Sequence, residues 1–297
     1  MIVRIPGLKA GVSLQTACEA MAAAFRERGI DSAQADARIL AGDALKLTRA
    51  QVISQGDRDL DAREADAIAA RAARRLKREP VSRIVGFREF WGLRLAIDPA
   101  VLDPRADTET LVETALDWIT TRGLRREALR ILDIGTGSGA LLLALLSELP
   151  DAFGVATDRS VAALAVARGN AGRLGFAGRC AFIACNFAGS LRGPFDLVVS
   201  NPPYISSGEI DTLEPEVRDY DPRVALDGGP DGLDAYRAIA ADGFRLLAPR
   251  GRLVLEVGRG QADAVSAIVN GAGLSIEQAP RRDLSGTRRA ICATTPQ

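Results

Sequence analysis

Near the start of the chain, apolar residues recur at helical spacing. A first helix is expected to begin behind Ser13, whose hydroxyl suits an N-cap, and to end at Gly29. A second helix is expected to start at Asp31 or Ser32, and a third at Asp61. The apolar face of the first helix consists of Leu14, Ala17, Cys18, Met21, Ala22 and Phe25. Amphipathic helices of this kind predict a small helical bundle.

A run of basic residues closes the third helix. Its members are Arg71, Arg74, Arg75, Lys77 and Arg78. Cations at a helix C-terminus interact favourably with the negative end of the helix dipole, which explains the run without a partner. The same residues would also suit docking of an acidic or RNA-bound partner. Both interpretations stay open at the level of the sequence.

The helical region ends at Pro80, and residues 86–97 then alternate in the manner of a β-hairpin. Trp91 and Gly92 lie where the turn of that hairpin is expected. After two Asp-Pro pairs, a further helix is expected at about 107–121.

From there to the end, strand-like runs alternate with helical segments. The runs are residues 130–134, 153–157, 180–184, 195–200, 252–257 and 288–293. This alternation predicts a doubly wound, mainly parallel sheet, with its ligand at the carboxyl ends of the strands. We therefore expect a helical bundle over residues 1–80, a hairpin linker over 81–105 and an α/β domain over 106–297.

Composition narrows the possible chemistry. Lys plus Arg and Asp plus Glu each total 38, so no net field draws the molecule to nucleic acid or to a membrane, and neither is expected as a direct partner. The chain has no histidine, which excludes an imidazole base and histidine metal ligands. Its four cysteines form no CxxC pair and are interpreted as buried thiols, and no metal is expected.

The N-terminus and the apolar runs of the chain indicate where the protein is located in the cell. The N-terminus lacks the charged-then-apolar pattern of a signal peptide. The longest strongly apolar run, residues 140–146, is too short to cross a bilayer. We expect a soluble, cytoplasmic protein.

A glycine-rich loop follows the first strand of the α/β domain. The loop consists of Gly135, Thr136, Gly137, Ser138 and Gly139. Glycines at alternate positions let the backbone turn sharply and approach a ligand closely. Asp158 follows the second strand, where a carboxylate can accept hydrogen bonds from both hydroxyls of a ribose. These features predict a nucleoside-containing cofactor, either NAD or S-adenosylmethionine. Asp133, before the first glycine, favours S-adenosylmethionine, because D-x-G-x-G-x-G resembles the methyltransferase form.

The tetrapeptide Asn201-Pro202-Pro203-Tyr204 comes directly after the fourth strand. Alone it could be an ordinary rigid turn, but its place behind the glycine loop favours a catalytic role. The Asn201 side-chain oxygen and the Pro202 carbonyl can each accept one N–H of a planar NH₂ group, and the prolines hold that segment rigid. Tyr204 offers a flat face to the same group. Such positioning can aim an amide or exocyclic amine at a methyl donor without a strong base.

Several flanking segments carry a family resemblance. They are GFREFWG (residues 86–92), LDPRADTE (102–109), EPEVRDY (214–220), ALDGG (225–229), DGL (231–233), EVG (256–258) and DLSG (283–286). With the tetrapeptide, these segments closely resemble the HemK/PrmC family of peptide-chain release factor glutamine N5-methyltransferases. The resemblance runs from about Pro80 to the end of the chain. The N-terminal helices match the family in their arrangement more than in their amino-acid sequence.

The resemblance implies a fold, a cofactor and a substrate. The implied fold is a class I S-adenosylmethionine-dependent methyltransferase domain with a seven-stranded sheet, an N-terminal helical bundle and a hairpin linker. Methyl transfer from S-adenosylmethionine would leave S-adenosylhomocysteine. The acceptor would be the glutamine in the GGQ motif of release factors, held by residues 201–204. The implied contacts of the cofactor are the glycine loop, Asp158, Asn186, Phe187 and Asn201.

The sequence differs from the family's usual sequence at two places. Ala106 stands where the family has a proline, and Asn186-Phe187 stands where it has Asp-Trp. Phe187 can still stack against adenine, whereas loss of the acidic group before it is expected to weaken cofactor binding.

Three alternatives share parts of this pattern. A ribosomal-protein glutamine methyltransferase uses the same tetrapeptide, and so do RNA and DNA exocyclic-amine methyltransferases. The segment around Arg105 to Glu109 favours the release-factor type. A binding module with weakened catalysis is motivated only by Asn186, and turnover on a release factor would distinguish it.

Overall fold

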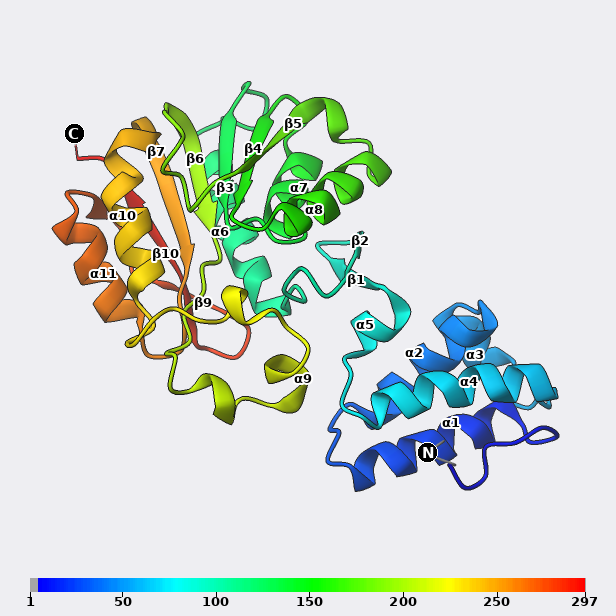
Figure 1. Cartoon of the computed structure of the whole chain (residues 1–297). Coiled ribbons are helices and arrows are strands. Elements are labelled where there is room, and N and C mark those ends of the chain that lie inside the picture. Colours follow the sequence, from blue (N-terminus) through cyan, green and yellow to red (C-terminus); the bar gives the residue numbers. More distant parts are fainter. Residues whose placement is uncertain (1–4, 297) are drawn as a thin grey trace. The chain divides into compact units, whose positions relative to one another are not determined.

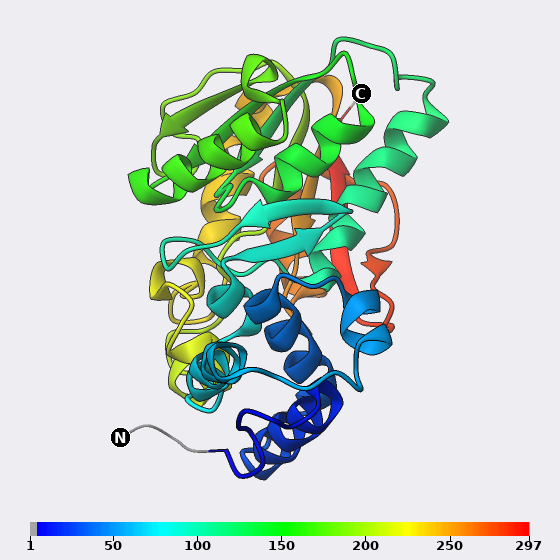
Figure 2. The ribbon, with the colours of Figure 1, turned by 90° about the vertical axis from the view of Figure 1, so that its right-hand side faces the viewer.

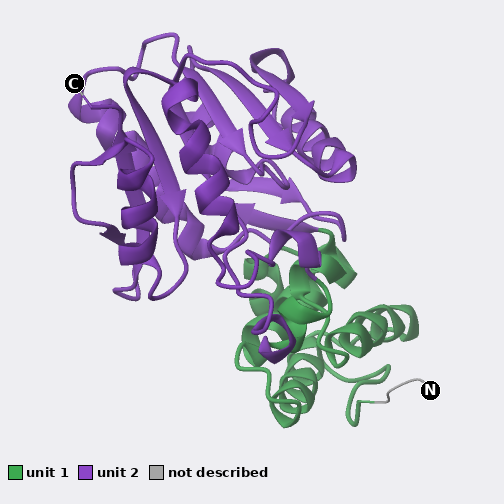
Figure 3. Cartoon of the chain, turned by 60° about the vertical axis from the view of Figure 1, so that its left-hand side comes forward, with its two compact units in different colours: residues 1–86, 214–220 green, residues 87–213, 221–297 purple. Residues whose placement is uncertain are grey.

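The computed structural model describes residues 5–296, which form two compact units (Figure 3). The first unit comprises the chain up to Gly86 together with Glu214–Tyr220, and the second comprises Phe87–Leu213 and the chain from Asp221 onward. The junction at Gly86 lies inside the linker expected at 81–105. A short segment from the later part of the chain therefore belongs to the helical unit.

The first unit is built from helices packed around an apolar core, and its described residues up to Gly86 are drawn in blue to cyan in Figure 2. Its elements are α1 (Leu14–Glu27), α2 (Ala33–Leu45), α3 (Arg49–Ser54), α4 (Ala62–Arg75), α5 (Val81–Val85) and, from the later segment, α9 (Pro215–Arg218). The three predicted helices are present as α1, α2 and α4. Ser13 caps α1 and Asp61 caps α4, each by accepting a hydrogen bond from a backbone N–H three residues on. Helices α3 and α5 were not predicted, because each is too short to show a helical period.

The four arginines of the basic run at the end of α4 are paired within this unit. The pairs are Arg71 with Asp43, Arg74 with Glu79, Arg75 with Asp36 and Glu216, and Arg78 with Glu214 and Glu216. The hydroxyl of Tyr220 also donates to the backbone carbonyl of Lys77 at 2.9 Å. These four arginines therefore have acidic partners within the chain, and the pairs of Arg75 and Arg78 attach the segment Glu214–Tyr220 to the helices.

The predicted hairpin opens the second unit. Strands β1 (Phe87–Phe90) and β2 (Leu93–Ala96) pair antiparallel. Trp91 and Gly92 form the turn with φ of 51° and 70°, the left-handed conformation that the right-handed twist of a two-residue hairpin requires. The prediction of this hairpin is confirmed.

The sheet of the second unit is mainly parallel (Figure 1). Its strands are β3 (Arg130–Ile134), β4 (Phe153–Asp158), β5 (Cys180–Ala184), β6 (Phe195–Ser200), β7 (Leu247–Glu256), β8 (Ser275–Ile276), β9 (Arg281–Arg282) and β10 (Arg288–Thr294). Their order is β5-β4-β3-β6-β7-β10-β8, with β9 pairing β10 off this path. The first five in that order are parallel, and β10 is antiparallel to β7 and β8. All six predicted strands are present; β8 and β9 were missed because two residues carry no period.

Helices cover both faces of this sheet. They are α6 (Glu109–Thr121), α7 (Ala140–Glu148), α8 (Val161–Arg173), α10 (Asp234–Leu246) and α11 (Ala262–Gly271), with short 3-10 turns η1 (Ala106–Thr108), η2 (Ala177–Arg179), η3 (Ile210–Thr212) and η4 (Arg223–Ala225). One apolar cluster joins α6, α7 and α8 to the sheet, and a second joins α10 and α11 to it. The doubly wound fold expected from the sequence is confirmed.

Two further expectations bear on membranes and thiols. No helix within residues 5–296 is both long and apolar enough to cross a membrane. All four cysteines are unpaired thiols. The interpretation as buried thiols is correct for Cys18, where burial raises the pKa to about 11, and wrong for Cys180, Cys185 and Cys292, which are partly exposed.

Candidate active site

The glycine loop links the carboxyl end of β3 to the first turn of α7. Gly135, Gly137 and Gly139 have φ of 72°, 54° and 85°, backbone angles that residues other than glycine rarely adopt. The backbone N–H groups of Gly135 and Thr136 both donate to the carbonyl of Thr157 at 2.9 Å. The loop is therefore fixed to the neighbouring strand β4, with an open surface toward the cavity that it lines.

Asp158, the last residue of β4, holds the other side of this loop. One carboxylate oxygen accepts from the backbone N–H of Gly137 at 3.0 Å, and the other accepts from that of Ser160 at 2.8 Å. Each oxygen keeps a further lone pair, because a carboxylate offers about four acceptor sites. Asp158 can thus bind a ribose diol and shape the glycine loop at the same time.

Asp133 lies beneath the loop and is almost fully buried. Its Oδ2 accepts from the Thr136 hydroxyl at 2.6 Å, while Oδ1 has no hydrogen-bond partner among the described residues. Burial raises the pKa of Asp133 to about 7, against the lowering effect of the Thr136 hydrogen bond. A buried carboxylate with an unused oxygen at the wall of a cavity fits a ligand that carries positive charge.

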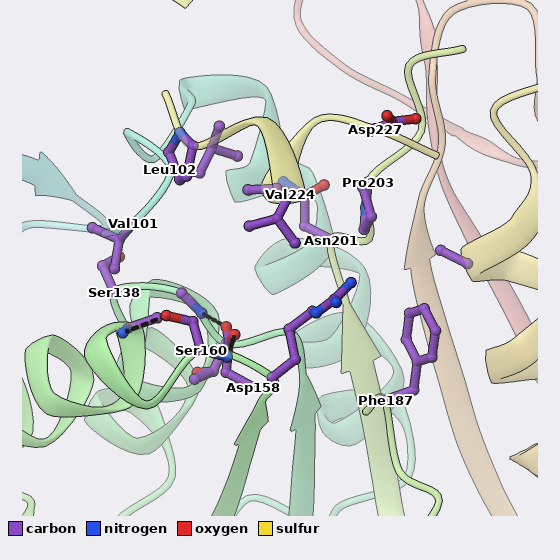
Figure 4. Close-up of a pocket in the computed structure, with 18 of the residues that line it drawn as sticks. Val101, Leu102, Ser138, Asp158, Ser160, Phe187, Asn201, Pro203, Val224 and Asp227 are labelled. Carbon is purple, nitrogen blue, oxygen red and sulfur yellow. Dashed lines mark hydrogen bonds between the residues drawn. The ribbon is translucent and has the colours of Figure 1, made fainter. Parts of the chain in front are cut away.

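Asn186 and Phe187 follow β5 at the same edge of the sheet. Phe187 has φ of 49°, an uncommon conformation for an aromatic residue, and both residues line the cavity. Figure 4 shows Phe187, Asp158 and Asn201 around this cavity. Besides lining the cavity, Phe187 packs against the apolar cluster that joins α10 and α11 to the sheet.

Asn201 begins the tetrapeptide directly after β6. Its Nδ2 donates to the hydroxyl oxygen of Thr108 at 3.2 Å, and that hydroxyl donates to Oε2 of Glu256 at 2.6 Å. Ser200, the preceding residue, donates its hydroxyl to the carbonyl of Ile134 at 2.7 Å, which fastens β6 to β3. The amide of Asn201 is therefore oriented by neighbours on two other elements.

Tyr204 at the end of the tetrapeptide packs against the apolar cluster beneath α10 and α11. Its hydroxyl lies 3.5 Å from Oε1 of Glu256, and its backbone carbonyl accepts from Nε2 of Gln261 at 2.8 Å. Burial, reinforced by the negative charge of Glu256, raises the pKa of the Tyr204 phenol. The phenol is thus a neutral hydrogen-bonding group.

A single cavity of about 480 Å³ brings most of the predicted residues together. Of the residues singled out in the sequence, its lining includes Gly135, Thr136, Gly137, Ser138, Asp158, Asn186, Phe187, Asn201 and Pro203. Gly139, Pro202 and Tyr204 lie outside the lining, and Gly139 instead packs against α7 and α8. The volume falls in the range of small-molecule and cofactor sites.

Other cavity residues carried no assigned role in the sequence. They include Thr108 before α6, and Ser207, Pro222, Val224 and Asp227 in the segment after the tetrapeptide. Asn170 of α8, outside the lining, donates to the carbonyl of Ser138 at 2.8 Å and so supports the loop from behind. Thr108, Asp227 and Glu256 fall within the family-like segments, which was the only signal that could have found them.

Family descriptions match both parts of the chain. The PrmC N-terminal domain matches residues 16–86, and a methyltransferase domain matches residues 125–272. The parallel sheet with an antiparallel last strand, the glycine loop and the acidic residue after β4 define a class I S-adenosylmethionine-dependent methyltransferase. The unused oxygen of Asp133 and the left-handed glycines fit that cofactor.

Proteins with similar sequences show which family within this class the chain belongs to. A release factor glutamine methyltransferase of Bradyrhizobium diazoefficiens is 50% identical over 99% of this chain and 98% of its own. Another, of Rhodospirillum rubrum, is 48% identical over 89% of this chain and 80% of its own. The chain belongs to the release factor glutamine methyltransferase family. The catalytic domain of hMettl16, solved with an RNA hairpin, is 15% identical with a TM-score of 0.54 over 77% of this chain and 82% of its own, which shows the shared fold alone.

Proposed function

We propose that this protein transfers a methyl group from S-adenosylmethionine to the side-chain amide nitrogen of a glutamine in peptide chain release factors, the glutamine of their GGQ motif. The observation that carries the proposal is the place of Asn201. Its side chain lines the same cavity as the glycine loop and Asp158, at the carboxyl end of β6. An acceptor for an amide N–H therefore lies beside the expected cofactor site.

Bound S-adenosylmethionine supplies an electrophilic methyl on a sulfonium. The glycine loop, Asp158 and Phe187 would hold it, with the Asp158 carboxylate on the ribose hydroxyls and Phe187 against the adenine. Asp133 places a buried carboxylate at the wall of the same cavity, where it favours a cationic ligand.

The acceptor side consists of the tetrapeptide. Oδ1 of Asn201 accepts one N–H of the glutamine amide, and the carbonyl of Pro202 accepts the other. The two contacts hold the NH₂ group in one plane and favour the positive charge that develops on nitrogen during attack. The methyl carbon–sulfur bond breaks as the nitrogen–carbon bond forms, and the methylated amide then releases one N–H proton to solvent. No strong base is needed before the transfer, in agreement with a chain that contains no histidine.

Mass spectrometry of purified release factors tests the proposal. The protein is incubated with a release factor and labelled S-adenosylmethionine, and the labelled peptide is mapped. We expect one methyl group on a single glutamine. No label on release factor, together with label on ribosomal protein or RNA in parallel incubations, would refute the proposed substrate.

Asp158→Ala is expected to weaken S-adenosylmethionine binding by roughly 1–3 kcal/mol, the scale of a lost hydrogen bond to a charged group. Part of the loss comes through the loop, since Asp158 also accepts from Gly137. Asp158→Asn keeps one acceptor and should lose less. Calorimetry measures both, and equal affinity of wild type and the alanine variant would count against this ribose site.

Cofactor affinity is expected to depend on pH through Asp133. Burial raises the pKa of this carboxyl to about 7, so it is neutral below that pH and ionised above it. A cationic ligand binds the ionised form better, so affinity should fall by roughly tenfold from pH 8 to pH 6. Calorimetry at both values provides the measurement. Asp133→Asn, which still accepts from Thr136, should flatten this dependence; an unchanged slope in that variant would assign the titration to another group.

A further inference from the structure

Glu256 is a buried acidic residue that contacts Tyr204 at one end of the tetrapeptide and is linked through Thr108 to Asn201 at the other. It is the last residue of β7 and is 1% exposed. Its Oε2 accepts from Thr108, which contacts Asn201, and its Oε1 lies 3.5 Å from the Tyr204 hydroxyl. Its backbone carbonyl accepts from the Tyr236 hydroxyl at 3.0 Å, which fixes the strand end. An acidic side chain is rarely buried this completely without a specific partner.

The direction of each hydrogen bond in this chain follows from donor and acceptor counts. Burial raises the pKa of Glu256 to about 7. Above that pH its side chain is a carboxylate, which only accepts, so Thr108 donates its single hydrogen to Glu256. The Thr108 oxygen can then only accept from Asn201, and the part of Asn201 that faces Thr108 must be its NH₂ group. The Asn201 oxygen is consequently the part left to accept an N–H.

The opposite orientation of Asn201 would be unproductive. With its NH₂ group toward the substrate, the side chain would present donors to a glutamine NH₂, which is itself a donor. The oxygen and nitrogen of an asparagine amide have nearly the same shape, so packing alone does not select between the orientations. A neighbour with a fixed hydrogen-bond direction does select.

We propose that Glu256 and Thr108 are positioning residues that set the orientation of the Asn201 amide for methyl transfer. The inference rests on the proposed function, because it concerns the same acceptor nitrogen. Glu256 lies outside the cavity lining and acts through Thr108, and its second oxygen holds the Tyr204 end of the tetrapeptide.

Thr108→Val tests the relay with almost no change in side-chain shape. Valine removes the acceptor for the Asn201 NH₂ group, so the amide loses its fixed orientation. We expect kcat on a release factor to fall by about tenfold to a hundredfold, the range of one misplaced catalytic contact. Affinity for S-adenosylmethionine should stay within about twofold. The matched control is Thr108→Ser, which keeps the hydroxyl and should retain most of kcat.

Glu256 is tested by a second pair of variants. Glu256→Leu removes the acceptor and frees the Thr108 hydrogen to bond the Asn201 oxygen, so kcat should fall by a similar factor. Glu256→Gln keeps an oxygen that can accept from Thr108 and should retain more activity than the leucine variant. Equal activity of the two variants would overturn the role of Glu256.

Thr108 itself lines the cavity, so a direct contact with the substrate is the competing explanation. A double-mutant cycle with Asn201→Ala separates the two. If Thr108 acts through Asn201, adding Thr108→Val to Asn201→Ala should leave kcat unchanged within about twofold. Multiplied effects would overturn the inference.

The wild-type enzyme sets the reference for these outcomes. An inactive wild type on all release factors would refute the proposed function and the inference with it. An active wild type whose Thr108→Val variant keeps full kcat, while Asn201→Ala does not, would refute the inference alone.

Discussion

Asn201→Ala is expected to lower kcat on a release factor by about a hundredfold or more, the magnitude seen when one preorganised polar contact is removed. The alanine variant loses the oxygen proposed to accept the glutamine N–H. The fold should survive, because Thr108 keeps its hydrogen bond to Glu256. Single-turnover rates at saturating cofactor give the measurement, and calorimetry confirms that the variant still binds S-adenosylmethionine.

Asn201→Asp separates the two ends of the amide. The carboxylate keeps an acceptor toward the substrate but loses the NH₂ group that donates to Thr108. We expect activity below wild type and above the alanine variant. If the alanine variant turned over at nearly the wild-type rate on a folded release factor, the glutamine-holding role of the tetrapeptide would be wrong.

Elements with a strong period were predictable from the sequence, and very short ones were not. Helix α1 shows a continuous apolar face behind a capping serine, and β6 is a run of apolar residues. Helix α5 and strand β9 have too few residues to display a period, and only tertiary packing defines them.

Some residues of the site were predictable from the sequence, and others were not. The glycine loop, Asp158 and Asn201 each follow a strand directly, so the parallel sheet alone brings them to one edge. Thr108 contacts Asn201 across 93 residues of the chain, and Glu256 contacts Thr108 across 148 residues. No local pattern indicates such a meeting, which depends on how α6 and β7 pack.

The basic run of α4 illustrates the same limit. Its local sequence fits a helix dipole or a docking patch equally well, whereas the structure pairs Arg75 with Asp36 on α2 and with Glu216 on a segment 141 residues away. A charge pattern gives the sign of a partner but not its location. A local charge pattern therefore cannot indicate acidic partners that come from distant parts of the same chain.

Arg75→Ala should destabilise the first unit by about 3–5 kcal/mol, because removing one member of a buried ion pair leaves the other charge uncompensated. The Arg75 side chain is 6% exposed, and its Nε lies 2.8 Å from Asp36 and its Nη1 2.9 Å from Glu216. Both tryptophans, Trp91 and Trp118, belong to the second unit, so their fluorescence does not report this loss. Hydrogen exchange read by mass spectrometry resolves each unit separately.

Amides of α2, α4 and α9 should lose protection by about a hundredfold or more in the Arg75→Ala variant, since each 1.4 kcal/mol corresponds to a factor of ten. Amides of β3 and β6 should keep theirs. Arg71→Ala is the matched control on the same helix: the Arg71 side chain is 25% exposed, and its pair with Asp43 should contribute no more than about 1 kcal/mol. Equal losses in the two variants would show that burial of Arg75 adds nothing. Unchanged protection of α9 in Arg75→Ala would show that this segment is held to the helices by Arg78 and Tyr220 instead.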